Sequence, residues 1–342
     1  DLGGGTFDIS ILAVKGNVFT VKAVGGDSRL GGDDFDEAVI TWAAKQFKAQ
    51  SGIDLAGDTS RDGMMARQLL KEAAETAKIE LSQSSRTNVI IPNCLGHSLD
   101  LELSVTEFNA LCEPLLARTV SHMKSVLADA GLKPADIDRV ILVGGATKTP
   151  AVREIVAREI KEPYVADRVD EVVSHGAALV AANFYLPEED MLPIEVVDVT
   201  GHSLGIDVLN EKHEVTFVPV IPRQTKYPCR RGFMGATSRP MQDEVLMQVF
   251  RGEDVNPEKN AYLGELSLPV SPPRVDFVPI GSIFELDADG IIHFTAVQLP
   301  IGSASATLID HAMKHNNELD LPVVDRLISS GKAKVRTVAI KT

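Results

Sequence analysis

The sequence predicts two domains of different class, an α/β domain followed by an all-β domain. The chain has 342 residues, which is more than one ordinary domain holds. Up to about residue 187, strand patterns alternate with long helical patterns, as is typical of α/β proteins. From residue 192, short strand patterns follow one another between prolines and glycines, as is typical of a β-sandwich.

The first half opens with a predicted hairpin. An apolar run over 7–14 predicts a strand, residues 15–17 can turn, and 18–24 returns as the second arm. Helices are predicted where apolar residues recur along one stripe. The remaining elements, in order, are helices over 33–50 and 60–81, a helical region ending at Ala130 with a break or kink at Pro114, a strand over 139–143, a helix over 150–160 and a helix from about 170.

The second half is predicted to consist of short strands. Prolines and glycines separate them, and their spacing is nearly regular. The predicted strands cover 203–208, 214–219, 244–250, 262–268, 280–286 and 291–296. After about residue 300 the pattern is weaker and indicates one more strand and one helix.

Composition excludes several functional classes. A net charge of −14 repels a phosphate backbone, and the nearest approach to a basic patch is Lys226 with Arg230 and Arg231, so we expect no nucleic-acid partner. No apolar run approaches the ~18 residues of a membrane span. Three cysteines far apart indicate a reducing compartment, and we expect a cytoplasmic protein. The chain has no recognisable signal peptide and begins with Asp, so a fragment or a processed chain is expected.

The segment DLGGGTFD over 1–8 is the sharpest candidate for a ligand site. Its glycines would let the backbone approach a ligand closely and offer amide N–H groups to phosphate oxygens. Thr6 adds a hydroxyl, and Asp1 and Asp8 could hold a hydrated divalent cation or orient a water. The alternative is an ordinary glycine-rich turn. The sequence has no GxxxxGK[ST] pattern, which argues against a P-loop fold.

Two weaker candidates lie farther along the α/β half. Residues 143–147 read as a strand, a turn and the start of a helix, where backbone N–H groups could meet a nucleotide, although many α/β turns have paired glycines. Glu75, Lys78 and Ser82 share one helix face and could grip a ribose or a base edge. By themselves, these three residues are better explained by an exposed charged face.

Taken together, these segments resemble the DnaK-type (seventy-kilodalton) heat-shock chaperone family. The matching segments stand in the family's order and cover roughly residues 1–300. They are DLGGGTFDIS at 1–10, GGDSRLGGDDFDE at 25–37, KEAAETAKIELS at 71–82, ILVGGATKTP at 141–150, DEVVSHGAALVAA at 170–182, DVTGHSLGID at 198–207 and FELDADGIIHFTA at 284–296.

The resemblance implies a fold and a domain order. Residues 1–187 would be the second lobe of an actin-like (ribonuclease-H-like) ATPase domain, and 188–200 an interdomain linker. Residues 201–300 would be a β-sandwich that binds peptides. Residues 301–342 would be a partial or atypical C-terminal segment, a strand plus a helix, too short for a full helical lid.

The resemblance also implies a nucleotide site for ATP or ADP with Mg2+. The residues carried over by position are Gly3, Gly4, Gly5 and Thr6 around the phosphates, Asp1 and Asp8 near magnesium and its waters, Gly31, Gly32, Glu75, Lys78 and Ser82 at the ribose and adenine, and Gly144, Gly145, Lys148 and Asp170 on the opposite wall. Asp1, Thr6 and Asp8 would form an incomplete catalytic set. Lys148 stands where the family usually has Arg, so a planar guanidinium able to stack on adenine is lost.

The peptide groove is implied in the same way. The positions that would line it are Ile206, Leu209, Phe233, Val245, Met247 and Ile280. Aliphatic side chains with backbone hydrogen bonds would accept extended apolar peptides with little sequence demand. The alternative for each residue is a place in the sandwich core. Phe233 is the least secure, because the stretch from Phe233 to Val245 is about two residues longer than usual.

The resemblance implies an ATP-dependent chaperone that assists protein folding, with a J-domain co-chaperone and a nucleotide exchange factor as partners of the complete protein. Ahead of DLGGGTFD the family has a half-domain with the first phosphate loop, a catalytic Lys and a Glu. We therefore expect this chain to bind peptide but to hydrolyse ATP poorly. Glu195 also places a charge in a linker that is usually aliphatic. The alternatives are a naturally shortened, non-catalytic peptide-binding module, or a sugar kinase or filament protein of the actin-like superfamily, against which the proline-punctuated second half argues.

Overall fold

The computed structural model describes residues 1–165, 168–169, 171–182, 185–187, 193–210 and 212–340, and of 303–305 only the backbone. The chain divides into two compact units. The first consists of Asp1–Phe19 and Ala23–Glu195, and the second of Thr20–Lys22 and Val196–Thr342. Each unit has an apolar core of its own.

The first unit is a mixture of helices and small sheets. Its elements are β1 (Phe7–Lys15), β2 (Val18–Asp27), α1 (Gly32–Ser51), α2 (Arg61–Glu80), β3 (Arg86–Cys94), β4 (His97–Ser104), α3 (Val105–Asp129), the 3-10 turns Pro134–Asp136 and Gly145–Lys148, β5 (Ile141–Leu142), α4 (Pro150–Glu159), β6 (Tyr164–Val165) and α5 (Val172–Ala182). The predicted hairpin over 7–24 is present as β1 and β2. From the predicted linker, β7 (Glu195–Val197) joins this sheet next to β2.

Local sequence explains where the long helices begin and end. The N–H of Gly31 donates to Asp34 at the start of α1, and Gly52 ends this helix in a left-handed conformation that glycine adopts at little cost. Ser104 and Glu107 form a reciprocal capping box at the start of α3. Pro114 was predicted to break or kink this region, and α3 continues through it to Asp129.

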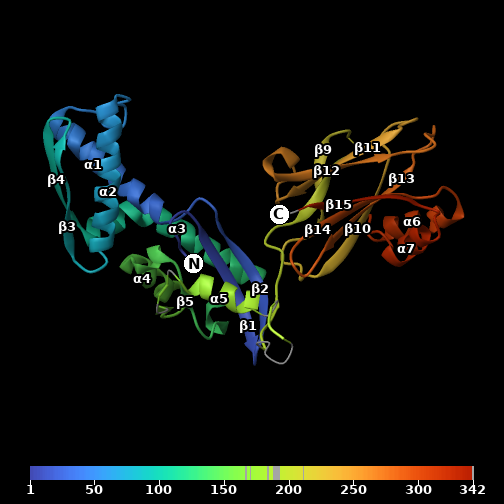
Figure 1. Cartoon of the computed structure of the whole chain (residues 1–342), viewed down its shortest axis with the longest axis horizontal. Coiled ribbons are helices and arrows are strands. Elements are labelled where there is room, and N and C mark those ends of the chain that lie inside the picture. Colours follow the sequence, from blue (N-terminus) through green and yellow to red (C-terminus); the bar gives the residue numbers. More distant parts are fainter. Residues whose placement is uncertain (166–167, 170, 183–184, 188–192, 211, 341–342) are drawn as a thin grey trace. The chain divides into compact units, whose positions relative to one another are not determined.

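A β-hairpin follows α2, and the sequence analysis did not predict it. Strands β3 and β4 pair antiparallel, with Arg86 opposite Ser104 and Ile91 opposite Leu99. Every second residue of β4 is buried, from Leu99 to Leu103. In Figure 1 this hairpin packs beside α2, at the end of the unit away from β1 and β2.

The second unit contains two four-stranded antiparallel sheets. Their orders are β12-β11-β8-β9 and β10-β13-β14-β15. The strands are β8 (Leu204–Leu209), β9 (Val215–Ile221), β10 (Cys229–Ala236), β11 (Glu244–Arg251), β12 (Ala261–Pro269), β13 (Pro279–Leu286), β14 (Ile292–Gln298) and β15 (Lys334–Ile340). Side chains of both sheets share one core, in which the rings of Phe284 and Phe294 lie 4.8 Å apart.

After residue 300 the sequence predicted one strand and one helix. The strand is present as β15, but two helices stand between β14 and β15. They are α6 (Ser303–Lys314) and α7 (Leu321–Ser329), and α6 packs beside β10 (Figure 1). Leu319, between the helices, is 3% exposed. A Cβ added to Gly232 would lie 2.8 Å from the Leu319 Cβ, and one added to Gly281 would lie 3.0 Å from a Leu319 methyl. Glycines on β10 and β13 therefore let this leucine pack directly on the sheet.

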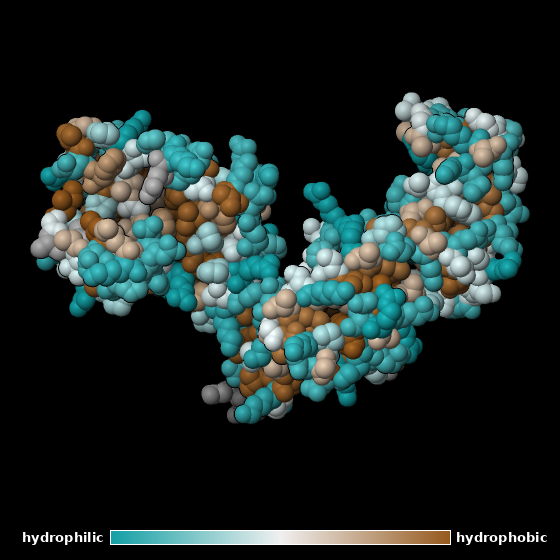
Figure 2. Space-filling model, turned by 180° about the vertical axis from the view of Figure 1, so that it is seen from behind, coloured by the Kyte–Doolittle hydropathy of each residue, from teal (hydrophilic) through white to brown (hydrophobic). Residues whose placement is uncertain are grey.

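The surface seen in Figure 2 is mixed in both units, with apolar side chains among hydrophilic ones. Within the described residues, no helix is long and apolar enough to cross a membrane. Over the same residues, no group of three or more His, Cys, Asp or Glu side chains is placed to hold a metal ion. Cys94, Cys112 and Cys229 are free thiols.

Candidate functional site

In the first unit, three glycine-containing loops meet. The N–H of Gly32 donates to the Gly3 carbonyl at 2.9 Å, and the N–H of Asp33 donates to the Gly4 carbonyl at 2.7 Å. From the third loop, the N–H of Ala146 donates to the Leu2 carbonyl at 3.1 Å. The structure thus brings together segments 1–6, 31–33 and 143–147, which lie far apart in the sequence.

Glycine is required where these loops touch. A Cβ on Gly31 would overlap the Gly4 carbonyl, and a Cβ on Gly144 would overlap the Asp1 carboxylate and the Leu2 carbonyl. Gly144 also has a φ of +91°, which strains any other residue. By contrast, a Cβ on Gly4 or Gly5 would meet nothing within 4 Å. The loop over 3–6 is therefore packed on one side and open on the other, so its backbone can be approached.

The two aspartates predicted near magnesium flank this loop. The N–H of Asp8 donates to the Asp1 carbonyl at 2.8 Å, so backbone pairing holds the two residues together. Both are exposed. Thr6 closes the turn, because its carbonyl accepts the N–H of Gly3 at 3.0 Å. Two carboxylates are too few to enclose a cation, but they suit a hydrated magnesium ion that also binds phosphate oxygens.

Lys78 is bound to a partner that the sequence analysis did not name. Its ammonium lies 2.8 Å from Asp36 Oδ2 and donates to the Gly32 carbonyl at 3.1 Å. The two side chains are 12% and 3% exposed, respectively. Burial raises the pKa of Asp36, and the nearby Lys78 opposes that shift. Asp36 Oδ1 is buried without a hydrogen-bond partner among the described residues.

The other residues predicted to bind nucleotide are more exposed or make weaker contacts than Lys78. Glu75 is exposed on α2, and the Ser82 hydroxyl donates to the Lys78 carbonyl at the long distance of 3.5 Å. Gly145 and Lys148 are exposed in the 3-10 turn that Gly144 precedes. Asp170 lies outside the described residues.

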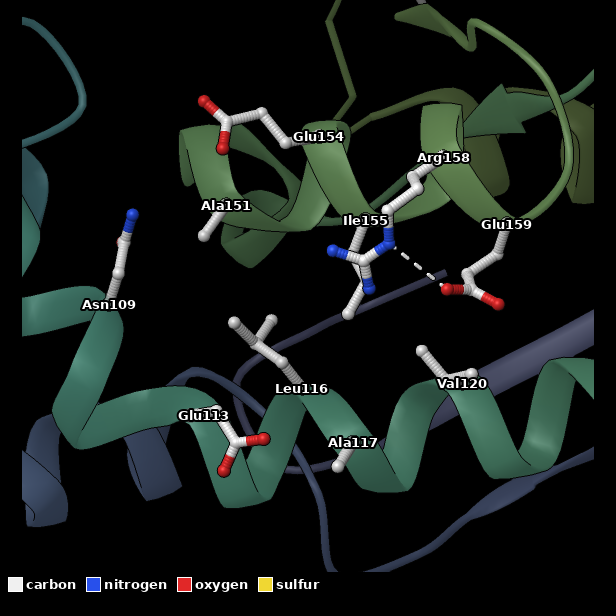
Figure 3. Close-up of a pocket in the computed structure, with 10 residues that line it drawn as sticks. All are labelled: Asn109, Glu113, Leu116, Ala117, Val120, Ala151, Glu154, Ile155, Arg158 and Glu159. Carbon is white, nitrogen blue, oxygen red and sulfur yellow. Dashed lines mark hydrogen bonds and ion pairs between the residues drawn. The ribbon is translucent and has the colours of Figure 1, made fainter.

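A pocket of about 380 Å³ lies between α3 and α4, separate from these loops. Leu116 and Val120 of α3 face Ile155 of α4, and Arg158 donates to Glu159 at its rim (Figure 3). None of the predicted nucleotide residues lines this pocket.

In the second unit, five of the six predicted groove residues belong to one apolar cluster. Ile206, Met247 and Ile280 are buried in it, and Phe233 and Val245 are partly buried against it. Leu209 is not in the cluster and is 47% exposed, because it lies on the opposite face of β8 from Ile206 and Val208. The buried residues could form a floor, while Phe233 and Val245 are accessible from outside.

The pairing between the two strands next to this cluster stops early. Within the described residues, β8 pairs with β11 only over Leu204–Ile206 with Val249–Arg251. Both strands continue, with β8 paired to β9 as far as Leu209 and β11 paired to β12 from Glu244. Beyond Ile206 and before Val249, β8 pairs with β9 and β11 pairs with β12. In the described part of the chain, the edges of β8 and β11 that face each other have no backbone pairing there.

The comparisons with known proteins identify the family of the chain. The family model described as Hsp70 protein matches residues 1–332. The chain belongs to the Hsp70 family. Proteins named "Chaperone protein DnaK" from Thermotoga neapolitana and Thermotoga petrophila are each 40% identical to it, over 327 and 318 residues.

These alignments cover 93% and 90% of the chain but 53% and 52% of the DnaK proteins. The chain therefore spans about half the length of the curated relatives it matches. The predicted membership of the DnaK-type family is confirmed.

Sequence reasoning did not single out Asp36, which pairs with Lys78, or Asp207, which accepts the N–H of Gln248. A signal for Asp36 was available, because it lies on the buried stripe of α1 with Phe35 and Val39, where a carboxylate needs a partner. No comparable sequence signal marked Asp207.

Proposed function

We propose that this chain is the nucleotide-lobe and peptide-binding part of an ATP-dependent Hsp70 chaperone, and that the chain itself binds extended apolar peptides. In this proposal the first unit is the second lobe of an actin-like ATPase domain and the second unit is a peptide-binding β-sandwich. Family membership and the identity to proteins named as DnaK chaperones support it. Unfolded peptides, a J-domain co-chaperone and a nucleotide exchange factor are the partners proposed for the whole protein.

The observation that carries the peptide-binding proposal is the early end of the β8–β11 pairing. An extended peptide can add to an exposed strand edge through main-chain hydrogen bonds, while pockets take its side chains. Here two such edges face each other above a floor of Ile206, Met247 and Ile280. A flexible methionine in that floor lets it accept side chains of different shape.

The proposed nucleotide is ATP or ADP with magnesium, at the loops over 1–6, 31–33 and 143–147. Gly3 to Thr6 would lie against the phosphates, and Asp1 and Asp8 would hold waters of the metal ion. The open outer side of Gly4 and Gly5 supports this assignment. We propose no efficient hydrolysis by this chain, because Asp1, Thr6 and Asp8 are an incomplete catalytic set among the described residues.

The test is fluorescence anisotropy of a labelled, extended, leucine-rich peptide with the full chain, with and without ATP. We expect micromolar binding that ATP leaves unchanged. Val245→Phe should weaken it by about tenfold or more, equivalent to ~1.4 kcal/mol, because the larger ring fills the accessible side of the cluster.

The matched control is Leu246→Phe. Leu246 is the next residue of β11, 55% exposed and on the opposite face, so its substitution should leave the affinity unchanged. Equal losses in both variants would contradict the groove, and absence of peptide binding by the unaltered chain would refute the proposed function. Weaker peptide binding on adding ATP would show that the nucleotide lobe is still coupled.

A further inference from the structure

The strand pairing between β8 and β11 ends at a specific side chain. The last pair is Ile206 with Val249, and the next residues in register are Asp207 and Gln248. At that position the N–H of Gln248 donates to Asp207 Oδ1, at 3.1 Å. A side-chain carboxylate thus accepts the N–H of the first β11 residue beyond the paired stretch.

The carboxylate of Asp207 is held in this place from several sides. It is partly buried, and burial raises its pKa, whereas the N–H groups of Gln248 and of Asp207 itself stabilise its ionised form. Its neighbours on the strand, Ile206 and Val208, point into the core, so the Asp207 side chain starts on the outer face and reaches sideways to β11. Partial burial and two amide donors indicate a defined position rather than a solvated surface charge.

We propose that Asp207 is a positioning residue that stops the β8–β11 ladder and so keeps a slot open for an extended peptide. The inference rests on the proposed peptide-binding function and names the residue that sets the inner end of the groove. By occupying the N–H of Gln248, the carboxylate prevents the two strands from pairing further. Residues 208–209 of β8 and 244–247 of β11 then keep facing edges to which a peptide backbone can bond.

A side chain without an acceptor should let the strands pair further and narrow the slot. Asp207→Val removes the acceptor and introduces a residue that favours strands. We expect the narrowed slot to weaken peptide binding by about tenfold or more, equivalent to ~1.4 kcal/mol. Asp207→Asn keeps a side-chain carbonyl for the N–H of Gln248, so its affinity should stay within about threefold of the unaltered chain.

The experiment measures binding of the same leucine-rich peptide to the full chain by anisotropy, together with amide hydrogen exchange at Leu209 and Leu246, whose N–H groups alternate with those of Val208 and Met247 and so lie on the facing edges. Asp207→Val should weaken binding and slow exchange at both amides, whereas Asp207→Asn should do neither. Glu265→Val is the matched control, because Glu265 is an exposed acid opposite Gln248 on its other side, in β12. It removes the same charge from the same sheet and should leave binding unchanged.

Each outcome separates the inference from the proposed function. Peptide binding by Asp207→Val as tight as that of the unaltered chain overturns the role of Asp207 and leaves the proposed function intact. A loss in Asp207→Asn as large as in Asp207→Val also overturns it, since the acceptor is then not what matters. If the valine variant does not fold, Asp207→Ala replaces it, and we expect the same loss of peptide affinity. An unaltered chain that binds no peptide overturns both.

Discussion

Lys78→Met should lower the free energy of unfolding of the first unit by about 3–5 kcal/mol, because it leaves a buried carboxylate without its cation. Asp36 is 3% exposed and Lys78 12%, and their charged atoms lie 2.8 Å apart. Methionine nearly conserves the length of the side chain, so the loss reports the missing charge and hydrogen bonds. Urea unfolding followed by the fluorescence of Trp42, the only tryptophan, measures it, because Trp42 packs against the core of the first unit.

The loss should also depend on pH. The pKa of Asp36 is already raised by burial, and removing Lys78 raises it further. Between the unfolded pKa and the higher folded pKa, the folded state binds more protons than the unfolded state. The free energy of unfolding therefore falls as pH rises through that window, and the penalty is complete above the folded pKa. Lys78→Met should be less destabilised near pH 5 than near pH 7.

Two further variants test the cause. Asp36→Asn in the Lys78→Met background removes the buried charge and should recover a large part of the lost stability. Lys71→Met removes an exposed lysine from the same helix and should change stability by less than about 0.5 kcal/mol. A Lys78→Met chain as stable as the Lys71→Met chain would show that the Lys78–Asp36 pair does not hold this site together.

The residues of this pair show how far the sequence could predict the nucleotide site. Helical spacing is visible in one dimension and predicted one helix face for Glu75, Lys78 and Ser82. The first two lie on α2, whereas Ser82 lies beyond its end at Glu80. The sequence could not show that α2 lies beside the start of α1, where Asp36 and the Gly32 carbonyl accept the ammonium. Contacts between distant segments depend on tertiary packing, which the local spacing of residues does not reveal.

The prediction of strands was also limited to what local sequence patterns reveal. The six strands predicted in the second half agree with β8, β9, β11, β12, β13 and β14 to within about two residues at each end. The prediction omitted β10, where Arg230, Arg231 and two glycines hide the strand pattern. Of the two β10 glycines, Gly232 is explained by Leu319, which lies 87 positions later in the sequence and packs on it. It also omitted β4, although its alternating leucines were a visible signal.

Leu319→Ala should lower the free energy of unfolding of the second unit by about 2–5 kcal/mol, because it removes a fully enclosed side chain and leaves a cavity. Leu319 is 3% exposed in a small core with Leu308, Val324 and Leu327, and its N–H donates to the Gly232 carbonyl at 3.0 Å. Hydrogen exchange at the β13 and β14 amides under native conditions measures the loss for this unit. Met313→Ala is the control, because Met313 is 79% exposed on α6, and it should change stability by less than about 0.5 kcal/mol.

Gly281→Ala distinguishes a cavity from a general loosening of α6 and α7. An added Cβ at this position would lie 3.0 Å from one Leu319 methyl and 3.6 Å from the other, so the single substitution should destabilise the unit. In the Leu319→Ala chain those methyl groups are gone, and the same Cβ fills part of the space they leave. The double variant should therefore be more stable than the sum of the two losses predicts, by ~1 kcal/mol. Strict additivity would mean that the helices detach from the sheet once Leu319 is shortened, and that Leu319 is what holds them there.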